Sequence, residues 1–242
     1  MITLRPAATI HAVDGGWFSA RWHFSFDQYR DPAWMGVGPL RVFNDDRLIP
    51  GAIWPLHPHR DIEGITYVVE GTFRHEDSAG NGGILKPGAI QRATLGRGMW
   101  HSEQNGSETE ALRFLQFWIL PDTPDLEPSL DQRQLDVADR TNRLLRVIGP
   151  EGGDVVKVHQ DASVHIARLE QGAVAQHALG EGRAAYLYVI DGGATLNGRQ
   201  LATGDAAVLS DETVSLAGGE TPAELILVDV PLRWTPVGVW AR

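Results

Sequence analysis

Two pairs of potential metal ligands stand out in the first half of the chain: His57 and His59, and His101 and Glu103. In each pair the residues are two positions apart, so on a β-strand both side chains of a pair point to the same face. If two such strands face each other across a small barrel, three imidazoles and one carboxylate can converge on one divalent ion. The spacing therefore predicts a metal site inside a β-barrel.

The chain contains no cysteine. This excludes disulfide bonds, thiolate ligands and a cysteine nucleophile, so a bound metal must rely on histidine and carboxylate ligands. The sequence also lacks the Gly-x-Ser-x-Gly motif of serine hydrolases and a phosphate loop of the Walker type. The candidate chemistry is thus narrowed to that of a metal with nitrogen and oxygen ligands.

The length of 242 residues and the hydrophobic content of 43% are sufficient for a large buried core. The 21 basic and 31 acidic residues give a net charge of −10, a sign that disfavours direct binding to nucleic acid. No run approaches the roughly 18 consecutive apolar residues of a membrane span, and the first residues lack the apolar segment of a secretory signal. The expected location is the cytoplasm.

The elements that must position these ligands are predicted to be strands. Short apolar or alternating runs recur between Gly, Pro, Asn and Asp residues, as in residues 65–69 and 112–120. This pattern indicates an all-β sandwich or barrel with few short helices. Because the run at 112–120 is apolar on both faces, we expect it to form a central strand that is covered on both sides.

A weak internal repeat indicates two similar units. Residues 65–71 resemble residues 186–192, and residues 85–89 resemble residues 201–205. Each copy reads as a strand, a tight turn, a second strand and another turn, with glycine supplying the backbone freedom that the turns need. We therefore expect two β units that share one topology.

A polar segment with several prolines at about 121–145 breaks the strand pattern and is expected to link the two units. This places the N-terminal unit at 1–130 and the C-terminal unit at 131–242. The second unit offers only His177 near the corresponding positions, with no second ligand pair. We expect the metal in the N-terminal unit alone.

The ligand residues lie within longer motifs. The segment from Gly51 to Glu63 has the spacing of the first cupin motif, and residues 86–88 followed by His101 resemble the second. Further short segments closely resemble the pirin family: His57-Pro58-His59-Arg60, Thr66-Tyr67-Val68-Val69-Glu70-Gly71, His75-Glu76-Asp77-Ser78, Lys86-Pro87-Gly88 and Gly96-Arg97-Gly98-Met99-Trp100-His101-Ser102-Glu103. Segments 38–42 and 159–162 resemble bacterial pirin-like proteins, so the likeness extends over nearly the whole chain.

The resemblance implies a bicupin, in which two cupin-type barrels pack together and only the N-terminal one holds a metal. The positions that match the ligands of the family are His57, His59, His101 and Glu103. The chain departs from the commonest pirin pattern at Asp61, Ile62 and Gly64. Because these residues lie beside the predicted site, we expect the differences to affect the fit of the substrate more than the binding of the metal.

The fourth ligand has a rival in Glu63, because ordinary cupins use the glutamate of the first motif. Strand parity does not decide between the two glutamates, and the resemblance favours Glu103. Glu63 is then expected to act as a second-shell acceptor that orients a ligand imidazole. His75 is interpreted as a structural residue in a turn or wall, and His159 in the second unit is interpreted as structural too.

Three nitrogens and one carboxylate leave coordination positions open, and Fe(II) suits this set best, although Mn, Ni, Co, Cu and Zn accept the same ligands. The resemblance implies quercetin 2,3-dioxygenase activity, in which a flavonol and dioxygen are the substrates and Glu103 takes the proton of the 3-hydroxyl. Trp54, Trp100 and Trp118 lie on or next to candidate strands, and we expect most of them in the core and one or two along a slot for a flat aromatic substrate.

Two other functions are compatible with the same site. The first is a non-enzymatic metal- or redox-sensing regulator that binds a partner protein, as the resemblance implies for eukaryotic pirins. The second is an isomerase or stress protein that acts on another small molecule. A wide apolar path from solvent to the metal would favour an enzyme, and a sealed site would favour sensing.

Overall fold

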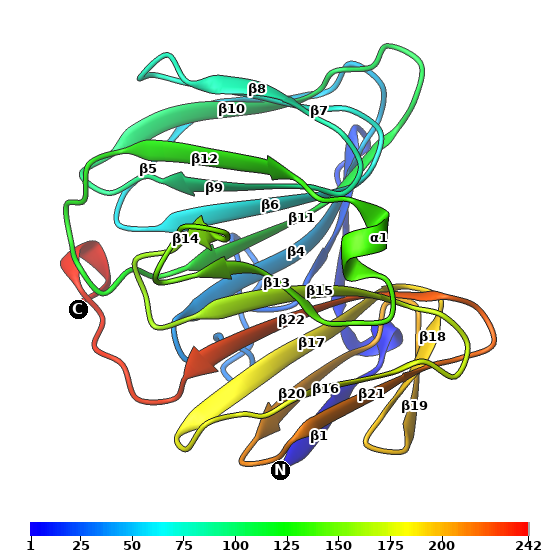
Figure 1. Ribbon diagram of the computed structural model, residues 1–242. Helices are drawn as coiled ribbons and strands as arrows, with labels where there is room; N and C mark the ends of the chain where they lie inside the picture. The colour runs from blue at the N-terminus through cyan, green and yellow to red at the C-terminus, as the bar shows by residue number, and fades with distance from the viewer. Residues whose placement is uncertain (242) are drawn as a thin grey trace.

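The computed structural model describes residues 1–241, and this part of the chain is almost entirely β-structure, as the sequence predicts. The N-terminal half contains a seven-stranded sheet and a four-stranded sheet that together form a barrel (Figure 1). The order in the larger sheet is β12 (Ser129–Gln134), β9 (Ala89–Thr94), β6 (Glu63–Glu70), β11 (Leu112–Ile119), β4 (Leu40–Leu48), β3 (Phe18–Trp22), β2 (His11–Asp14). The order in the smaller sheet is β5 (Ile53–His59), β10 (Met99–Asn105), β7 (Phe73–Asp77), β8 (Gly82–Leu85).

The C-terminal half repeats this arrangement (Figure 1). Its larger sheet has the order β1 (Ile2–Arg5), β20 (Ala206–Ser210), β17 (Arg183–Asp191), β22 (Ala223–Pro231), β15 (Ser163–Leu169), β13 (Leu145–Gly149), β14 (Val156–Lys157). Its smaller sheet has the order β16 (Val174–His177), β21 (Val214–Gly218), β18 (Gly193–Leu196), β19 (Arg199–Ala202). The helices are short: α1 (Val137–Arg140) and the 3₁₀ turns η1 (Ala7–Thr9) and η2 (Gly238–Trp240).

The internal repeat reflects equivalent places in the two halves. Residues 65–71 lie on β6 and its following turn, and β6 lies between β9 and β11 in its sheet. Residues 186–192 lie on β17 and its following turn, and β17 lies between β20 and β22. Both segments end in a glycine with positive φ, Gly71 at 83° and Gly192 at 79°. A Cβ at either glycine would lie within 2.4 Å of a backbone oxygen, so only glycine fits these turns.

Strand β11 separates two cores, as its apolar character on both faces predicts. Leu115 and Phe117 point to one face and pack in the large core shared by the two halves. Leu112 and Phe114 point to the other face and pack inside the N-terminal barrel. Gln116 and Trp118 continue this inner row and line cavities in the barrel. Because side chains alternate between the two faces of β11, this one strand contributes both to the contact between the halves and to the site.

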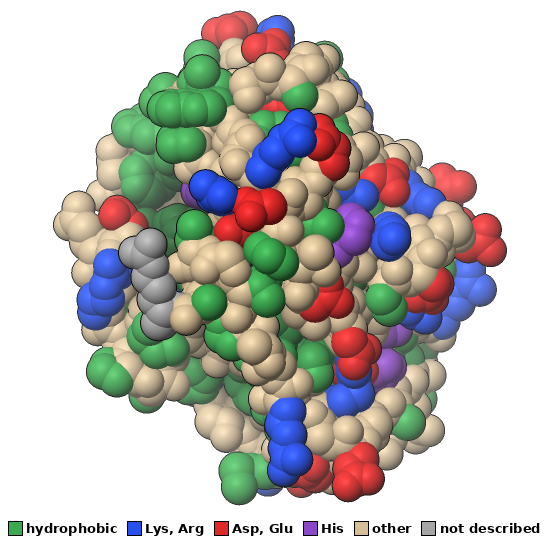
Figure 2. Space-filling model, turned by 90° about the vertical axis from the view of Figure 1, so that its left-hand side faces the viewer, with side chains coloured by type: hydrophobic (Ala, Val, Ile, Leu, Met, Phe, Trp, Pro, Cys, Tyr) green, Lys and Arg blue, Asp and Glu red, His purple; other side chains and the backbone are tan. Residues whose placement is uncertain are grey.

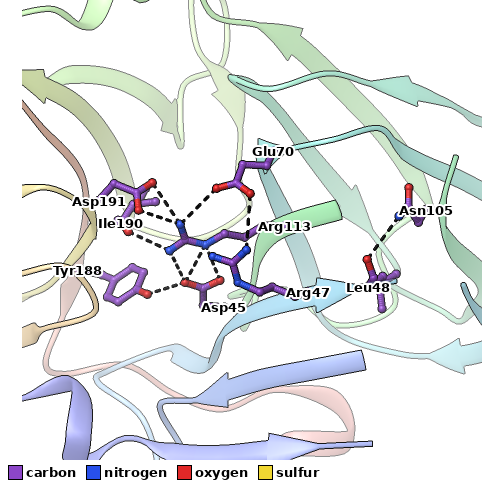
Figure 3. A network of polar contacts seen from close by, with 9 residues as sticks. All are labelled: Asp45, Arg47, Leu48, Glu70, Asn105, Arg113, Tyr188, Ile190 and Asp191. Atoms are coloured by element: carbon purple, nitrogen blue, oxygen red, sulfur yellow. Dashed lines mark hydrogen bonds and ion pairs between the residues drawn. The ribbon is translucent and has the colours of Figure 1, made fainter. Parts of the chain in front are cut away.

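The two seven-stranded sheets pack against each other through aromatic residues and one buried charge network. The ring of Phe43 lies 5.1 Å from that of Tyr186 across the contact. Beside them, the guanidinium of Arg113 donates hydrogen bonds to Asp45 on β4 and to Asp191 of the C-terminal half (Figure 3). The Tyr188 hydroxyl donates to the same Asp45 carboxylate at 2.5 Å. This network fixes β4, β11 and β17 relative to one another.

The sequence predicts a boundary between the two units at residue 130. Three segments belong to, or contact, the half on the other side of this boundary. Strand β1 pairs with β20 and so belongs to the C-terminal sheet, while β12 pairs with β9 and extends the N-terminal sheet to Gln134. The chain end also returns to the N-terminal half, where the backbone N–H of Val239 donates to Asp61. Both halves thus contain strands or tails from the opposite end of the chain (Figure 1).

No helix in residues 1–241 is long and apolar enough to cross a membrane. On the face drawn in Figure 2, basic side chains are scattered and most of them neighbour acidic ones. This face therefore offers no continuous basic surface.

Candidate metal site

Three of the four predicted ligands, the histidines, meet in the N-terminal barrel. His57 and His59 lie at the end of β5, and His101 lies on β10, where its Cα is paired with that of His57. One ligand atom from each of the three histidines lies within 4.8 Å of the other two. The structure corrects one detail: β5 and β10 are hydrogen-bonded neighbours in one sheet and do not face each other across the barrel. Cross-strand pairing alone brings the imidazoles together, because directly paired side chains lie about 5 Å apart.

The orientation of His57 is fixed by its own strand. Its Nδ1 lies 2.8 Å from the carbonyl oxygen of Pro55, to which an N–H at this position donates. This bond leaves Nε2 as the free nitrogen, which is the usual arrangement of a metal-binding imidazole. His59 is held differently, because its ring packs edge-on against Trp118 with the centroids 4.7 Å apart.

His101 is oriented by a second histidine that the sequence did not assign to the site. Nδ1 of His101 lies 3.2 Å from Nε2 of His75, on β7, and both rings are buried. Nε2 of His101 is fully buried and has no hydrogen-bond partner among the described residues. An unsatisfied nitrogen in a ring that lies 4.5 Å from the ring of His57 and 5.2 Å from that of His59 is the strongest single indication that the site accommodates a metal ion. The sequence predicts a purely structural role for His75, and the structure adds a contact with the candidate ligand His101.

Two of the three imidazoles, those of His59 and His101, are in the state that metal binding requires. Burial lowers the pKa of His59 to about 4, with a further contribution from His57. Burial also lowers the pKa of His101 far below its ordinary value, and the neighbouring histidines add to the effect. At neutral pH both rings are therefore uncharged and present nitrogen lone pairs.

Glu103 shares the cavities that the histidines line but lies outside the compact group of three. Its carboxylate is buried and accepts a hydrogen bond from the side-chain amide of Gln116 on β11. The register between β10 and β5 is irregular between His101 and Glu103, which shifts Glu103 relative to the histidine pair. Burial raises the pKa of Glu103 to about 7, and the hydrogen bond from Gln116 opposes this rise. The carboxylate is thus placed to act as a fourth ligand or as a proton acceptor.

Glu63 does not have the expected role. The residue is buried on the face of β6 that points to the C-terminal half, so its neighbours are not the ligand imidazoles. Its carboxylate accepts hydrogen bonds from the Thr94 hydroxyl at 2.7 Å and from the backbone N–H of His159 at 2.7 Å, and Nδ1 of His159 lies 2.8 Å away. Instead of a ligand, Glu63 orients His159 and ties the two halves together.

A cavity of about 440 Å³ opens onto His57, His59 and Glu103. Its walls combine aromatic and polar side chains, and the lining residues besides the candidate ligands are Phe18, Trp22, Phe26, Asp27, Asn44, Asp46, Trp54, Pro55, Leu56, Gln116 and Trp118. Trp54 and Trp118 line this cavity, whereas Trp100 is 49% exposed and lies neither in the core nor along the cavity. Leu56 at the rim is 57% exposed, which shows that the cavity is open to solvent. Its volume is in the range of pockets that bind small organic molecules.

The two unusual residues after the histidine pair lie away from this cavity. Asp61 is buried with a φ of 52°, and its carboxylate accepts hydrogen bonds from the backbone N–H groups of Asp125 and Val239. Ile62 is buried in a separate apolar cluster with Leu95. Neither residue lines the 440 Å³ cavity, so their contacts stabilise surrounding loops and the chain end.

Comparison with known proteins places these features in a family. The family model described as Pirin matches residues 5–119, and the one described as Quercetinase C-terminal cupin domain matches residues 147–230. These two matches agree with the expected all-β architecture of two cupin domains. The residues between them, 120–146, contain the segment in which the sequence predicts a linker.

Similar proteins match over almost their whole length. A quercetin 2,3-dioxygenase from Escherichia coli K12 is 36% identical, with 96% of this chain and 99% of that protein covered. A pirin-like protein from Caulobacter vibrioides is 37% identical, with 95% and 99% covered. The crystal structure of bacterial pirin YhhW from Escherichia coli in complex with nickel(II) has a TM-score of 0.89 at 35% identity, covering 98% of this chain and all of that one. The chain therefore belongs to the pirin family.

Proposed function

We propose that this protein is a metal-dependent dioxygenase that opens the heterocyclic ring of flavonols such as quercetin. The observation that carries the proposal is the aromatic-lined cavity of about 440 Å³ that meets His57, His59 and Glu103 at one end. A planar polyphenol fits a slot with aromatic walls, and its reacting oxygens would lie beside the imidazoles. Relatives named quercetin 2,3-dioxygenase, at 36% identity over nearly the whole chain, support the same reaction.

The proposed ion is Fe(II), held by His57, His59 and His101 with Glu103 as the fourth ligand. Three neutral nitrogens and one carboxylate form a mixed donor set that iron accepts while leaving positions open, and Mn, Ni, Co, Cu and Zn accept it too. When bound, the ion supplies Lewis acidity toward the flavonol oxygen and a site at which dioxygen meets the substrate. Nickel(II) is named in the structure of the Escherichia coli relative.

Glu103 is proposed to accept the proton of the flavonol 3-hydroxyl during the reaction. The substrate reacts more readily when its 3-hydroxyl is deprotonated, so a carboxylate near that oxygen must accept a proton. Without a metal the pKa of Glu103 is about 7, and a cation bound beside it would favour the ionised form that accepts the proton. Gln116 holds the carboxylate by donating a hydrogen bond, so the acceptor oxygen is oriented before the substrate arrives.

The aromatic walls position the flavonol and exclude water from the reacting oxygens. Trp118 packs against His59 on one side, while Phe18 and Trp54 pack against each other with their centroids 5.2 Å apart. Rings in such positions bind a flat substrate by stacking or edge contacts. In the overall reaction both atoms of dioxygen enter the products, the heterocycle opens to an ester, and one carbon leaves as carbon monoxide.

The regulatory alternative has less support. A protein that senses the oxidation state of its metal needs no room beside the ion, since open positions can be filled by water. The cavity here is open at Leu56 and is lined by five aromatic residues together with several polar side chains, which is typical of a site for a small organic molecule. We therefore place the enzyme ahead of the metal- or redox-sensing regulator that binds a protein partner.

Oxygen uptake with quercetin tests the proposal. Protein loaded with Fe(II) is compared with metal-free protein, with His101→Ala, and with His11→Ala as a control on an exposed histidine. We expect oxygen consumption matched by carbon monoxide release in the loaded wild type and in His11→Ala, and neither in the other two samples. If no flavonol gives metal-dependent oxygen uptake, the proposed enzyme function is wrong.

A further inference from the structure

Two polar side chains face the proposed substrate cavity without a protein partner. Asn44 and Asp46 lie on β4, are each 2% exposed, and line the same cavity as His57 and Glu103. Oδ1 of Asn44 is buried with no hydrogen-bond partner among residues 1–241. The carboxyl group of Asp46 also makes no hydrogen bond or ion pair with residues 1–241, but its oxygens are not among the fully buried atoms. An unpaired amide and an unpaired carboxyl group beside one cavity point to a ligand that supplies the missing bonds.

The register of the sheet places these groups relative to the reacting end of the cavity. Asn44 is paired directly with Gln116, the residue that donates to Glu103. Asp46 lies two residues further along the same face of β4, which corresponds to about 7 Å. The neighbours of Asp46 on the adjacent strands are Ala20 and Phe114, neither of which can form a side-chain hydrogen bond. A molecule that reaches His57 and His59 can therefore also extend to Asp46 within the same cavity.

We propose that Asn44 and Asp46 bind the phenolic hydroxyl groups of the substrate that lie away from the reacting 3-hydroxyl. This inference rests on the proposed function and adds a basis for its selectivity: the site favours polyhydroxylated flavonols over those that carry the 3-hydroxyl alone. A site built to hydrogen-bond a hydroxyl group discriminates against an analogue without it, because the buried polar groups then stay unpaired.

The protonation state of Asp46 agrees with this role. Burial, followed by the neighbouring carboxylates of Asp45 and Glu103, raises the pKa of Asp46 well above its usual value. A carboxyl group accepts a hydrogen bond from a phenolic hydroxyl in either protonation state, and its neutral form also donates one. The side-chain amide of Asn44 also offers a donor and an acceptor.

Binding of two flavonols tests the inference without relying on turnover. Quercetin carries four hydroxyl groups besides the 3-hydroxyl, whereas 3-hydroxyflavone carries none. Their dissociation constants are measured by calorimetry on protein loaded with Zn(II), and by tryptophan fluorescence on metal-free protein. The variants are Asp46→Leu and Asn44→Leu, with Asp46→Asn as the conservative change that keeps a donor and an acceptor. Glu181→Leu on an exposed loop is the control, and thermal melting verifies that each variant is folded.

In the wild type and in Glu181→Leu we expect quercetin to bind at least ten-fold more tightly than 3-hydroxyflavone. Each leucine variant reduces this ratio by about three- to ten-fold through weaker quercetin binding, and Asp46→Asn restores part of it. An unchanged ratio in both folded leucine variants would overturn the inference while leaving the proposed function intact. A wild type that binds neither compound and consumes no oxygen with them would overturn both.

Discussion

Nε2 of His75 lies 3.2 Å from Nδ1 of His101, on the side of the His101 ring opposite to its free Nε2. The two residues are 26 positions apart and meet because β7 and β10 are neighbours in the four-stranded sheet. When Nδ1 of His101 carries the proton and donates to Nε2 of His75, Nε2 of His101 is left for a metal. His75 is therefore a positioning residue in this account.

Replacing His75 with alanine is expected to weaken metal binding by about 10- to 100-fold, which is the usual cost of losing such a partner. The affinity is measured by competition with a chromophoric chelator, using Zn(II) and Ni(II). His75→Gln, which keeps a hydrogen-bonding group, is expected to recover part of the affinity. His165→Gln is the matched control, since His165 is also buried but lies in the C-terminal barrel. Equal metal affinities of His75→Ala and the wild type would refute the positioning role.

Replacing Glu63 with leucine separates the domain contact from the metal site. The variant loses the carboxylate that accepts hydrogen bonds from Thr94 and from the backbone of His159, so we expect a loss of about 2 kcal/mol or more in the free energy of unfolding. Metal affinity is expected to stay within two-fold of the wild type, because Glu63 does not contact a candidate ligand. Urea denaturation and the chelator competition provide the two measurements. A large loss of metal affinity with unchanged stability would restore the role that the sequence suggested for Glu63.

The buried network around Arg113 is expected to control stability. In Arg113→Met the carboxylate of Asp45 loses its ion pair while it stays buried, which typically costs about 3–5 kcal/mol. The double variant Arg113→Met, Asp45→Leu is expected to recover much of this loss, since no uncompensated charge remains. Arg47→Met serves as the control, because the pair of Arg47 with Glu70 is exposed and contributes about 1 kcal/mol or less. Equal effects of Arg113→Met and Arg47→Met on urea denaturation would contradict this view.

Acid sensitivity should include a contribution from His165. Burial, with a smaller contribution from His177, lowers the pKa of His165 to about 4. Below the unfolded-state value of about 6.5, the unfolded chain binds a proton that the folded protein does not, so stability falls as the pH drops from about 6.5 to about 4. Between pH 7.5 and pH 5 this contribution amounts to about 2 kcal/mol.

The variant His165→Gln removes this titration. The wild type should therefore lose about 2 kcal/mol more free energy of unfolding than the variant when the pH falls from 7.5 to 5. Urea denaturation at several pH values gives the comparison, and His11→Gln, at an exposed position, serves as the control. A difference between His165→Gln and the wild type that does not change with pH would show that His165 is protonated equally in both states.

Much of the site could be predicted from local sequence because it depends on local geometry. The spacing of His57 and His59 fixes a common face on any strand, and the same holds for an apolar run such as 112–120 that fills two cores. Those two patterns were sufficient to predict a central strand and an imidazole cluster. The family motifs added the residue that completes the proposed ligand set, Glu103.

The remaining features depend on which strands become neighbours, and a single sequence does not specify this pairing. His75 contacts His101 only through the pairing of β7 with β10. Glu63 turns toward the C-terminal half because it shares the outer face of β6 with Ile65 and Tyr67, both of which pack in the core between the halves. Likewise, nothing in residues 2–5 indicates that β1 completes the opposite sheet.

The central claim is that His57, His59, His101 and Glu103 hold one metal ion. Anomalous diffraction from crystals of Fe(II)-loaded protein, collected on both sides of the iron absorption edge, tests it most directly. The account predicts a single strong peak with one nitrogen of each histidine and one oxygen of Glu103 at about 2.0–2.2 Å. A peak elsewhere in the molecule, or none among these histidines in fully loaded protein, would contradict it.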